Sequence, residues 1–155
     1  MKQQIATNKF QSERLLKCGV PEETSDMCWV GGFLNVMLYG AMLDQCLGDS
    51  AIKGEERGAE IIDLTPAWSL SALLSLLPKE IKVDENPYDE VQEYELLIYP
   101  FMGGWRVDYQ YCEDDECHCL KCVYSTDLIE ACVKAIEWLT ANGYKLNGIE
   151  KGGEK

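Results

Sequence analysis

The sequence has few basic residues. Its 155 residues include 14 Lys and Arg against 27 Asp and Glu, which gives a formal net charge of −13. Non-specific binding to nucleic acid depends on Lys and Arg that neutralise phosphates, and an anionic membrane surface repels an acidic protein. We therefore expect no nucleic-acid partner and no membrane association.

Long apolar runs are also missing. The most apolar stretch, 33–47, is interrupted by Asn35, Gly40, Asp44 and Gln45, and it is shorter than the ~20 residues that a spanning helix needs. The first ten residues contain no apolar core of a signal peptide. These two absences predict a cytoplasmic location. Cytoplasmic cysteines are normally reduced, so we expect the 8 cysteines to be buried thiols or metal ligands and not disulfides.

The sequence has a single histidine, His118, so any Cys/His or Ser/His mechanism would have to use it. No serine lies in a G-x-S-x-G pattern, and the glycine pairs at 31–32, 103–104 and 152–153 lack the context of a phosphate-binding loop. The acidic residues are too numerous for their spacing to single out a catalytic pair. We predict no catalytic and no cofactor-binding residue.

What is present is typical of a folded globular domain. Hydrophobic residues make up 46% of the chain and charged residues 26%, and the length suits one domain. Residues 147–155 are rich in Gly, Lys and Glu, and they predict a flexible C-terminal tail. We therefore expect a single domain over 1–146.

The first half of the chain predicts three helices and one strand. A short helix is expected over 12–17, a strand over 34–39 and a helix over 41–47. The clearest pattern predicts a helix over 66–77, with Thr65 as its N-cap and Pro66 in its first position. Its buried face should carry leucines at helical spacing, namely Leu70, Leu73, Leu74 and Leu77.

The second half predicts a β meander followed by a helix. Alternating patterns indicate strands over 94–98, 105–111 and 119–124, and Asp127 is the expected N-cap of a helix over 128–141. In the middle strand, three residues are expected to pack on this helix and three to face solvent: Trp105, Val107 and Tyr109 inside, and Arg106, Asp108 and Gln110 outside. The predicted class is α+β, a small antiparallel β meander packed against two or three helices.

Three blocks of the sequence carry a resemblance. They are Arg14–Trp29, Thr65–Leu74 and Asp127–Leu139. In this order they resemble a family of small uncharacterised proteins from gut anaerobes and their prophages or mobile elements. The resemblance implies an accessory role in such an element, and it implies no activity, cofactor or catalytic residue.

A cysteine-rich segment is the one feature that suggests site chemistry. It places five possible zinc ligands close together: Cys112, Cys117, His118, Cys119 and Cys122. Their spacing matches none of the usual paired C-x2-C arrangements, and in a regular strand Cys119 and Cys122 would point to opposite faces. We therefore favour no metal site and expect no stoichiometric zinc. A zinc site and an oxidisable thiol pair stay as alternatives.

Acidic residues gather in two runs, 80–95 and 108–116. Such runs either imitate a nucleic-acid backbone for a basic partner or simply keep the surface solvated, and we favour the second interpretation. The function that we favour is a non-enzymatic phage- or mobile-element-type accessory protein acting through an unknown protein partner. The alternatives are a small zinc-binding module and an unrecognised enzyme.

Overall fold

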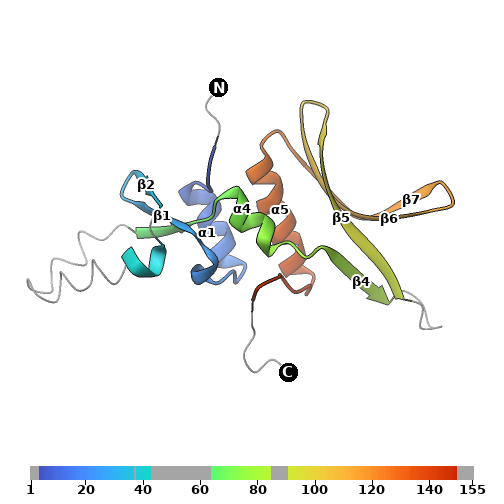
Figure 1. Cartoon of the computed structure of the whole chain (residues 1–155), viewed down its shortest axis with the longest axis horizontal. Coiled ribbons are helices and arrows are strands. Elements are labelled where there is room, and N and C mark those ends of the chain that lie inside the picture. The colour runs from blue at the N-terminus through green and yellow to red at the C-terminus, as the bar shows by residue number, and fades with distance from the viewer. Residues whose placement is uncertain (1–3, 37, 43–63, 85–90, 150–155) are drawn as a thin grey trace, which may run out of the picture. The chain divides into compact units, whose positions relative to one another are not determined.

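The protein has an α+β fold with two antiparallel sheets, one of three strands and one of four (Figure 1). The computed structural model describes residues 4–36, 38–42, 64–84 and 91–149. The two antiparallel sheets with their helices confirm the predicted α+β class. The chain divides into two compact units, 1–73 and 74–155, which are described separately below. The single domain expected over 1–146 stays a prediction.

The first unit contains the three-stranded sheet, in the order β2-β1-β3. Its elements are α1 (Lys9–Lys17), the short 3-10 helix η1 (Glu22–Thr24), β1 (Met27–Val30), β2 (Phe33–Asn35), β3 (Leu64–Ala67) and the start of α4 (Leu70–Leu76). The helix expected over 12–17 is confirmed as α1. It begins earlier than predicted because Asn8 and Gln11 form a reciprocal capping box. Buried side chains of this unit include Leu15, Cys28 and Trp68.

The helix predicted over 66–77 is present, but its predicted start at Pro66 is wrong. Pro66 lies in β3, where it pairs with Cys28 of β1. β3 is an edge strand, and an edge strand tolerates the missing N–H of proline. The helix begins at Leu70, after Ser69, whose hydroxyl accepts a hydrogen bond from the Ala72 amide.

The strand predicted over 34–39 is also partly wrong. Strand β2 ends at Asn35, and residues 39–42 are already helical. The rest of the helix predicted over 41–47 lies outside the described residues. Leu34 pairs with Trp29 of β1, so the short strand is one arm of a hairpin.

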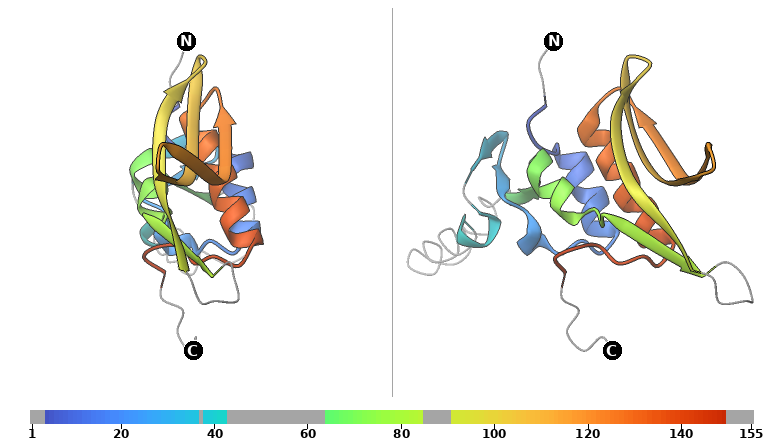
Figure 2. Two further views of the ribbon diagram at one scale, coloured as in Figure 1. Left: turned by 90° about the vertical axis from the view of Figure 1, so that its right-hand side faces the viewer. Right: turned by 45° about the vertical axis from the view of Figure 1, so that its right-hand side comes forward.

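The second unit contains the predicted meander and its helix (Figures 1 and 2). Its elements are β4 (Glu80–Asp84), β5 (Val91–Phe101), β6 (Gly104–Glu113), β7 (Glu116–Ser125) and α5 (Leu128–Ala141). The strands pair in chain order, β4-β5-β6-β7, and each pair is antiparallel. The three predicted strands and the helix are confirmed, whereas β4 was not predicted.

Helix α5 lies along one face of this sheet, which we call the helix-covered face (Figure 2). Val107 and Tyr109 of β6 are buried there, as predicted, and the Tyr109 hydroxyl donates a hydrogen bond of 2.7 Å to the Pro78 carbonyl. The expectation that Asp108 faces solvent is wrong, because its side chain is 0% exposed. Asp108 lies on the opposite face of the sheet, where neighbouring side chains donate hydrogen bonds to its carboxylate.

The expected tail begins with an anchored residue. The backbone amide of Asn147 donates to the Leu76 carbonyl at 2.8 Å, and its side-chain amide donates to the Leu77 carbonyl at 3.1 Å. Leu146, just before it, is buried. Residues 150–155 of the expected tail lie outside the described part of the chain.

Candidate functional site

Asp108 is the centre of a polar network on the face of β6 opposite α5. We call this the outer face. Both oxygens of the Asp108 carboxylate accept hydrogen bonds from Arg106, at 3.0 Å from Nε and 2.8 Å from Nη2. The Tyr99 hydroxyl donates at 2.6 Å and the Gln110 amide at 3.1 Å. Four donated bonds explain why this carboxylate can be buried.

Aromatic rings complete the network. The Arg106 guanidinium carbon lies 4.8 Å from the centre of the Phe101 ring and 5.6 Å from that of Tyr99, within cation–π range. The hydrogen bond to Asp108 raises the pKa of Tyr99 and also raises that of Arg106. At neutral pH Tyr99 is therefore a neutral phenol and Arg106 a guanidinium cation.

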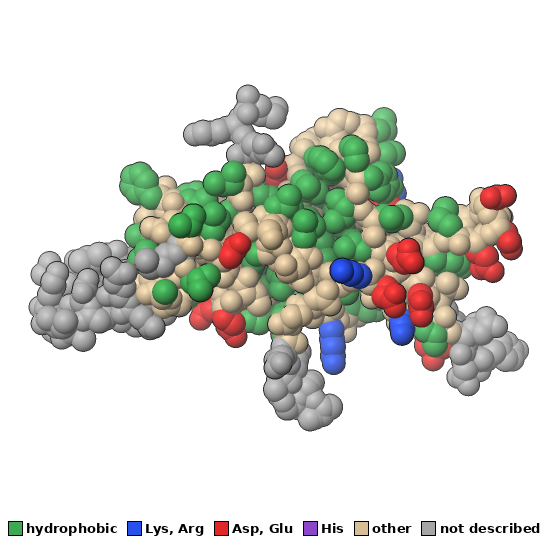
Figure 3. Space-filling model, viewed as in Figure 1, with side chains coloured by type: hydrophobic (Ala, Val, Ile, Leu, Met, Phe, Trp, Pro, Cys, Tyr) green, Lys and Arg blue, Asp and Glu red, His purple; other side chains and the backbone are tan. Residues whose placement is uncertain are grey.

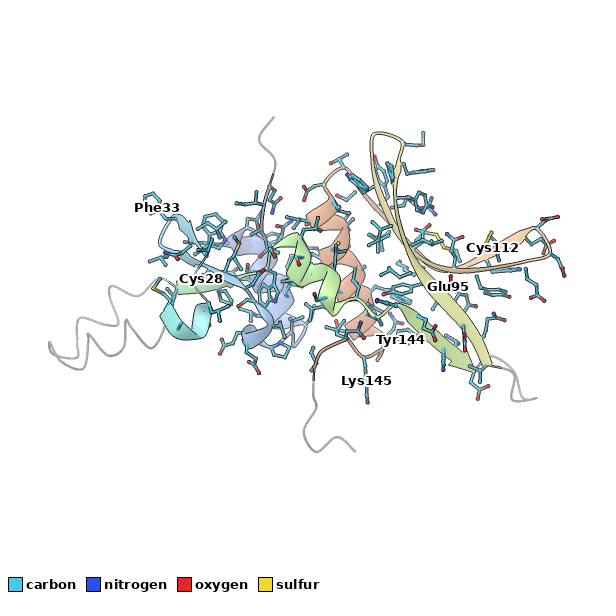
Figure 4. The ribbon with its side chains drawn as sticks, viewed as in Figure 1. Cys28, Phe33, Glu95, Cys112, Tyr144 and Lys145 are labelled. Atoms are coloured by element: carbon cyan, nitrogen blue, oxygen red, sulfur yellow. A yellow bond between two sulfur atoms is a disulfide. The ribbon has the colours of Figure 1, made fainter. Side chains whose placement is uncertain are left out.

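Four cysteines of the outer face are joined in two disulfides. Cys112–Cys117, here the turn disulfide, joins directly opposed residues of β6 and β7 whose Cα atoms are 4.0 Å apart, and Cys112 lies toward the tip of the hairpin (Figure 4). Cys119–Cys122, here the bulge disulfide, joins two residues of β7 with Cα atoms 6.5 Å apart. The expectation of reduced thiols is wrong for these four residues. Cys46 lies outside the described residues.

A β-bulge explains the second pairing. The register between β6 and β7 shifts by one residue: Tyr109 pairs with Lys121, but the next residue, Gln110, pairs with Cys119. Leu120 is therefore the extra residue of the bulge. The bulge reverses the alternation of side chains, so Cys119 and Cys122 share the outer face. The prediction that they point to opposite faces is wrong for this reason.

The structure does not bring together all five residues that the sequence offers as possible zinc ligands. Cys112 and Asp108 lie on the same strand, four residues or ~13 Å apart, and Cys122 is paired with Asp108. Thiolates of one zinc ion lie within ~4 Å of each other, so Cys112 and Cys122 cannot share an ion in this hairpin. The ring of His118 is stacked on that of Tyr111, 4.8 Å away, on the other side of β7.

A smaller cluster is formed instead. One carboxylate oxygen of Asp108 and the sulfur atoms of Cys119 and Cys122 all lie within 4.8 Å of one another. Asp108 could not be recognised from the sequence as a member of this cluster, because its position in the alternating pattern indicates a solvent-facing side chain. It is the disulfide-bonded form that the structure shows, so these sulfur atoms are not available as thiolates before reduction.

The described acidic residues of both runs lie on this sheet and its hairpin. Exposed members include Glu80, Asp84, Glu93 and Glu95 on β4 and β5, and Glu113, Asp114, Asp115 and Glu116 at the β6–β7 turn (Figure 3). Asp108, counted in the second run, is buried. The Lys82 Nζ atom lies 3.9 Å from Glu93 Oε2 across the β4–β5 pair. The other residues of the first run, 85–90, lie outside the described part of the chain.

A groove separates strand β7 from helix α5. Its volume is about 350 Å³. The lining residues come from β7 and from one face of α5: Lys121, Cys122, Val123, Tyr124, Lys134, Glu137 and Trp138. The Lys134 ammonium donates to the Tyr124 carbonyl at 3.4 Å. Of these residues only Cys122 was considered from the sequence, as a possible zinc ligand, because the two sides of the groove meet only in the folded unit.

No protein-family model, curated protein or solved structure matches the chain. In the described ranges, no helix has both the length and the apolar character required to cross a membrane.

Proposed function

We propose that the protein is a non-enzymatic interaction protein that binds an extended segment of a partner protein beside strand β7. The segment would add to the sheet as a further strand and place side chains in the groove between β7 and α5. The resemblance of three sequence blocks to small proteins of gut anaerobes and their prophages supports an accessory role in a mobile element.

The groove next to a sheet edge is the observation that carries this proposal. β7 is the last strand of its sheet, and within the described residues no strand pairs with its second edge. Every second residue of an edge strand directs its N–H and C=O groups away from the sheet, where an added strand binds them. A neighbouring helix then provides a groove for alternate side chains of the added strand.

The charge of the groove defines the segment that fits it. Lys121 and Lys134 outnumber Glu137, so the groove is locally positive on a chain whose net charge is −13. We therefore expect the partner segment to carry a carboxylate that binds in the groove. Trp138 provides an apolar wall and is half-buried, so a neighbouring side chain of the segment should be apolar.

A library of random heptapeptides, displayed on phage and selected on the full-length protein, tests the proposal. Selected peptides should contain a carboxylate next to an apolar residue, and they should bind in extended form. N-methylation of a selected peptide at every second backbone amide should abolish binding, because those amides bind the edge of β7, whereas the amides between them should tolerate the change.

Variants of the protein locate the binding surface. Lys134→Glu and Trp138→Ala should each weaken binding of the selected peptide about tenfold or more, as expected for loss of a charged contact or an aromatic anchor. Lys145→Glu makes the same change of charge as Lys134→Glu, but at an exposed residue that does not line the groove. It should leave binding unchanged. Equal weakening by Lys145→Glu, or no alternation in the N-methyl series, would contradict the proposal.

A zinc-binding module is the second candidate, favoured by the proximity of Asp108, Cys119 and Cys122. It applies to the reduced protein, since thiolates and not disulfides bind zinc. Elemental analysis of reduced protein dialysed against zinc tests it: Cys119→Ser/Cys122→Ser should remove bound zinc, and Cys112→Ser/Cys117→Ser should not. The reverse pattern would exclude this cluster as the zinc site.

A further inference from the structure

Cys122 lies at the place where the proposed partner segment would bind. Among the described residues that line the groove between β7 and α5, it is the cysteine. Its side chain is exposed, and it belongs to β7, whose second edge pairs with no strand in the described part of the chain. A segment added beside β7 would therefore place one of its residues directly opposite Cys122.

The alternation of β7 decides which side of the added segment meets Cys122. Lys121 pairs with Tyr109, which is buried on the helix-covered face, and Lys121 lines the groove. Cys122 pairs with Asp108 and lies on the outer face. Successive residues of the added segment alternate in the same way. A residue next to the one that enters the groove therefore lies on the outer face, beside the bulge disulfide.

Directly opposed residues of neighbouring strands are close enough for a disulfide. Their Cβ atoms lie ~4.5–5.5 Å apart, and the Cβ atoms of a disulfide lie ~3.5–4.5 Å apart, so a small approach of the strands is sufficient. The hairpin already contains a bond of this kind, because the turn disulfide joins the directly opposed Cys112 and Cys117. A cysteine of the added segment opposite Cys122 would be placed in the same way.

The bulge disulfide can open without detaching any element of the fold. Cys119 and Cys122 belong to one strand, and the ladder to β6 holds that strand on both sides of the bulge. A disulfide that closes so short a loop restricts the unfolded chain less than one that closes a long loop, so opening it costs less stability. Both cysteines are exposed, so a thiol can reach them.

We propose that Cys122 captures a cysteine of the bound partner segment by forming an intermolecular disulfide with it. This proposal deepens the proposed function and rests on it, because the segment must first bind beside β7. It specifies the chemistry of the partner: an extended segment in which a cysteine is adjacent in sequence to the acidic residue that enters the groove.

The step is a thiol–disulfide exchange. The thiolate of the partner cysteine attacks the Cys122 Sγ atom, and a new S–S bond forms as the bond between Cys119 and Cys122 breaks. The electron pair of the broken bond leaves on the Cys119 sulfur, which takes up the proton that the partner thiol has lost. One disulfide replaces another, so the step needs no further oxidant. Attack of Cys119 on Cys122 reverses the capture.

The direction of attack favours Cys122 over Cys119. The attacking thiolate approaches in line with the S–S bond, from the side opposite the leaving sulfur. The bulge disulfide runs along β7, so attack on Cys122 comes from the side of Tyr124, which also lines the groove. Attack on Cys119 comes from the side of the hairpin tip, beyond the groove residues. The outer-face positions opposite Cys122 and Tyr124 are therefore the productive ones.

A cysteine scan of a selected heptapeptide that lacks cysteine tests the proposal. Cysteine replaces each position in turn, the peptide is added to the oxidised full-length protein, and the covalent adduct is measured by intact mass spectrometry after acid quenching. The rate should be about tenfold or more higher at an outer-face position next to the acidic residue than at the positions that enter the groove. Peptide mapping should find the bond at Cys122. Equal rates at all positions, or a bond at Cys112 or Cys117, would overturn the proposal.

Two double variants separate the two disulfides. Cys112→Ser/Cys117→Ser retains the bulge disulfide and should form the adduct at the rate of the wild type. Cys119→Ser/Cys122→Ser should form no adduct with the fastest peptide of the scan. The opposite pattern would contradict capture by Cys122. Peptide mapping of the wild-type adduct locates the bond without any variant, so the test stands even if a variant does not fold.

Serine analogues of the scanned peptides separate this proposal from the proposed function. They bind in the same way but cannot form a disulfide. Binding of the serine analogues, together with no position-dependent adduct at Cys122, would overturn the capture and leave the proposed function intact. Absence of binding by the serine analogues and by the selected peptide itself would contradict the proposed function, and the capture with it.

Discussion

At the scale of single residues, Asp108 shows how an alternating strand pattern can mislead. The pattern places Asp108 on the face away from α5, and in the structure Asp108 does lie on that face. Its side chain is nevertheless buried. Arg106, Tyr99 and Gln110 surround the carboxylate with donors. A charge can be removed from water without a covering helix when its neighbours supply enough hydrogen bonds.

Asp108→Asn tests the energetic role of this network. The amide keeps the shape of the side chain but removes the charge that balances Arg106, whose side chain is only 22% exposed. We expect the free energy of unfolding to fall by about 2 kcal/mol, as measured by urea denaturation at pH 7. Asp84→Asn, at an exposed position of β4, is the control and should change it by less than about 0.5 kcal/mol. Equal effects would show that the network adds no stability.

Cys132 makes the free energy of unfolding depend on pH in the alkaline range. Burial, with a smaller contribution from the charge of Asp127, raises the pKa of its thiol from 9.0 to about 12. The unfolded chain loses this proton first, so the free energy of unfolding is constant below about pH 9 and falls as the pH rises toward 12. Burial also raises the pKa of Tyr109, which acts in the same direction above pH 10. Urea denaturation at pH 8 to 10.5 should therefore show a steady loss of stability.

Cys132→Ala separates the two contributions. The variant should be less stable than the wild type at pH 8, because a buried side chain is truncated, but its stability should decline less steeply above pH 9. Cys18→Ala serves as the control, since Cys18 is half-exposed, and it should keep the steepness of the wild type. The same steepness in all three proteins would contradict the assignment to Cys132.

At the scale of elements, the segment 64–76 shows tertiary pairing overriding a local helix signal. Thr65 and Pro66 form a good helix start by sequence, but β1 offers them strand partners, and the helix starts four residues later. Asp26 supports that start, because its carboxylate accepts hydrogen bonds from the amide and the hydroxyl of Ser69. The local signal correctly indicated that a helix exists and misplaced its first turn.

Two alanine substitutions distinguish the predicted cap from the observed one. Ser69→Ala removes the hydroxyl that accepts from the Ala72 amide, and it should lower the free energy of unfolding by about 1 kcal/mol. Thr65→Ala, at the position that the sequence alone indicates as the cap, should lower it by less than about half as much, since Thr65 lies in a strand. Thermal and urea denaturation measure both. A larger effect of Thr65→Ala would support the helix start that the sequence predicts.

At the scale of the whole molecule, the net charge of −13 opposes folding through repulsion between exposed carboxylates. Salt screens this repulsion: the Debye length falls from about 30 Å at 0.01 M to about 8 Å at 0.15 M ionic strength. The acidic residues of the β4–β5 pair and of the β6–β7 turn are largely exposed, so screening reaches them.

We expect the melting temperature to rise by several degrees as sodium chloride is increased from about 0.01 M to about 0.15 M. Replacing Glu113, Asp114, Asp115 and Glu116 by their amides removes four negative charges and should reduce this rise. Differential scanning calorimetry at pH 7 measures both effects. A melting temperature independent of salt in both proteins would show that surface repulsion does not limit the stability.

Local periodicity and capping were enough to predict the α+β class, the meander of β5, β6 and β7, and the full extent of α5 with its Asp127 cap. Four features could not be predicted in this way: the start of α4, the burial of Asp108, the bulge at Leu120 with its disulfide, and the groove beside β7. Each of these depends on a partner distant in sequence or on one extra residue in a ladder, and neither is visible in the spacing of residues along the chain.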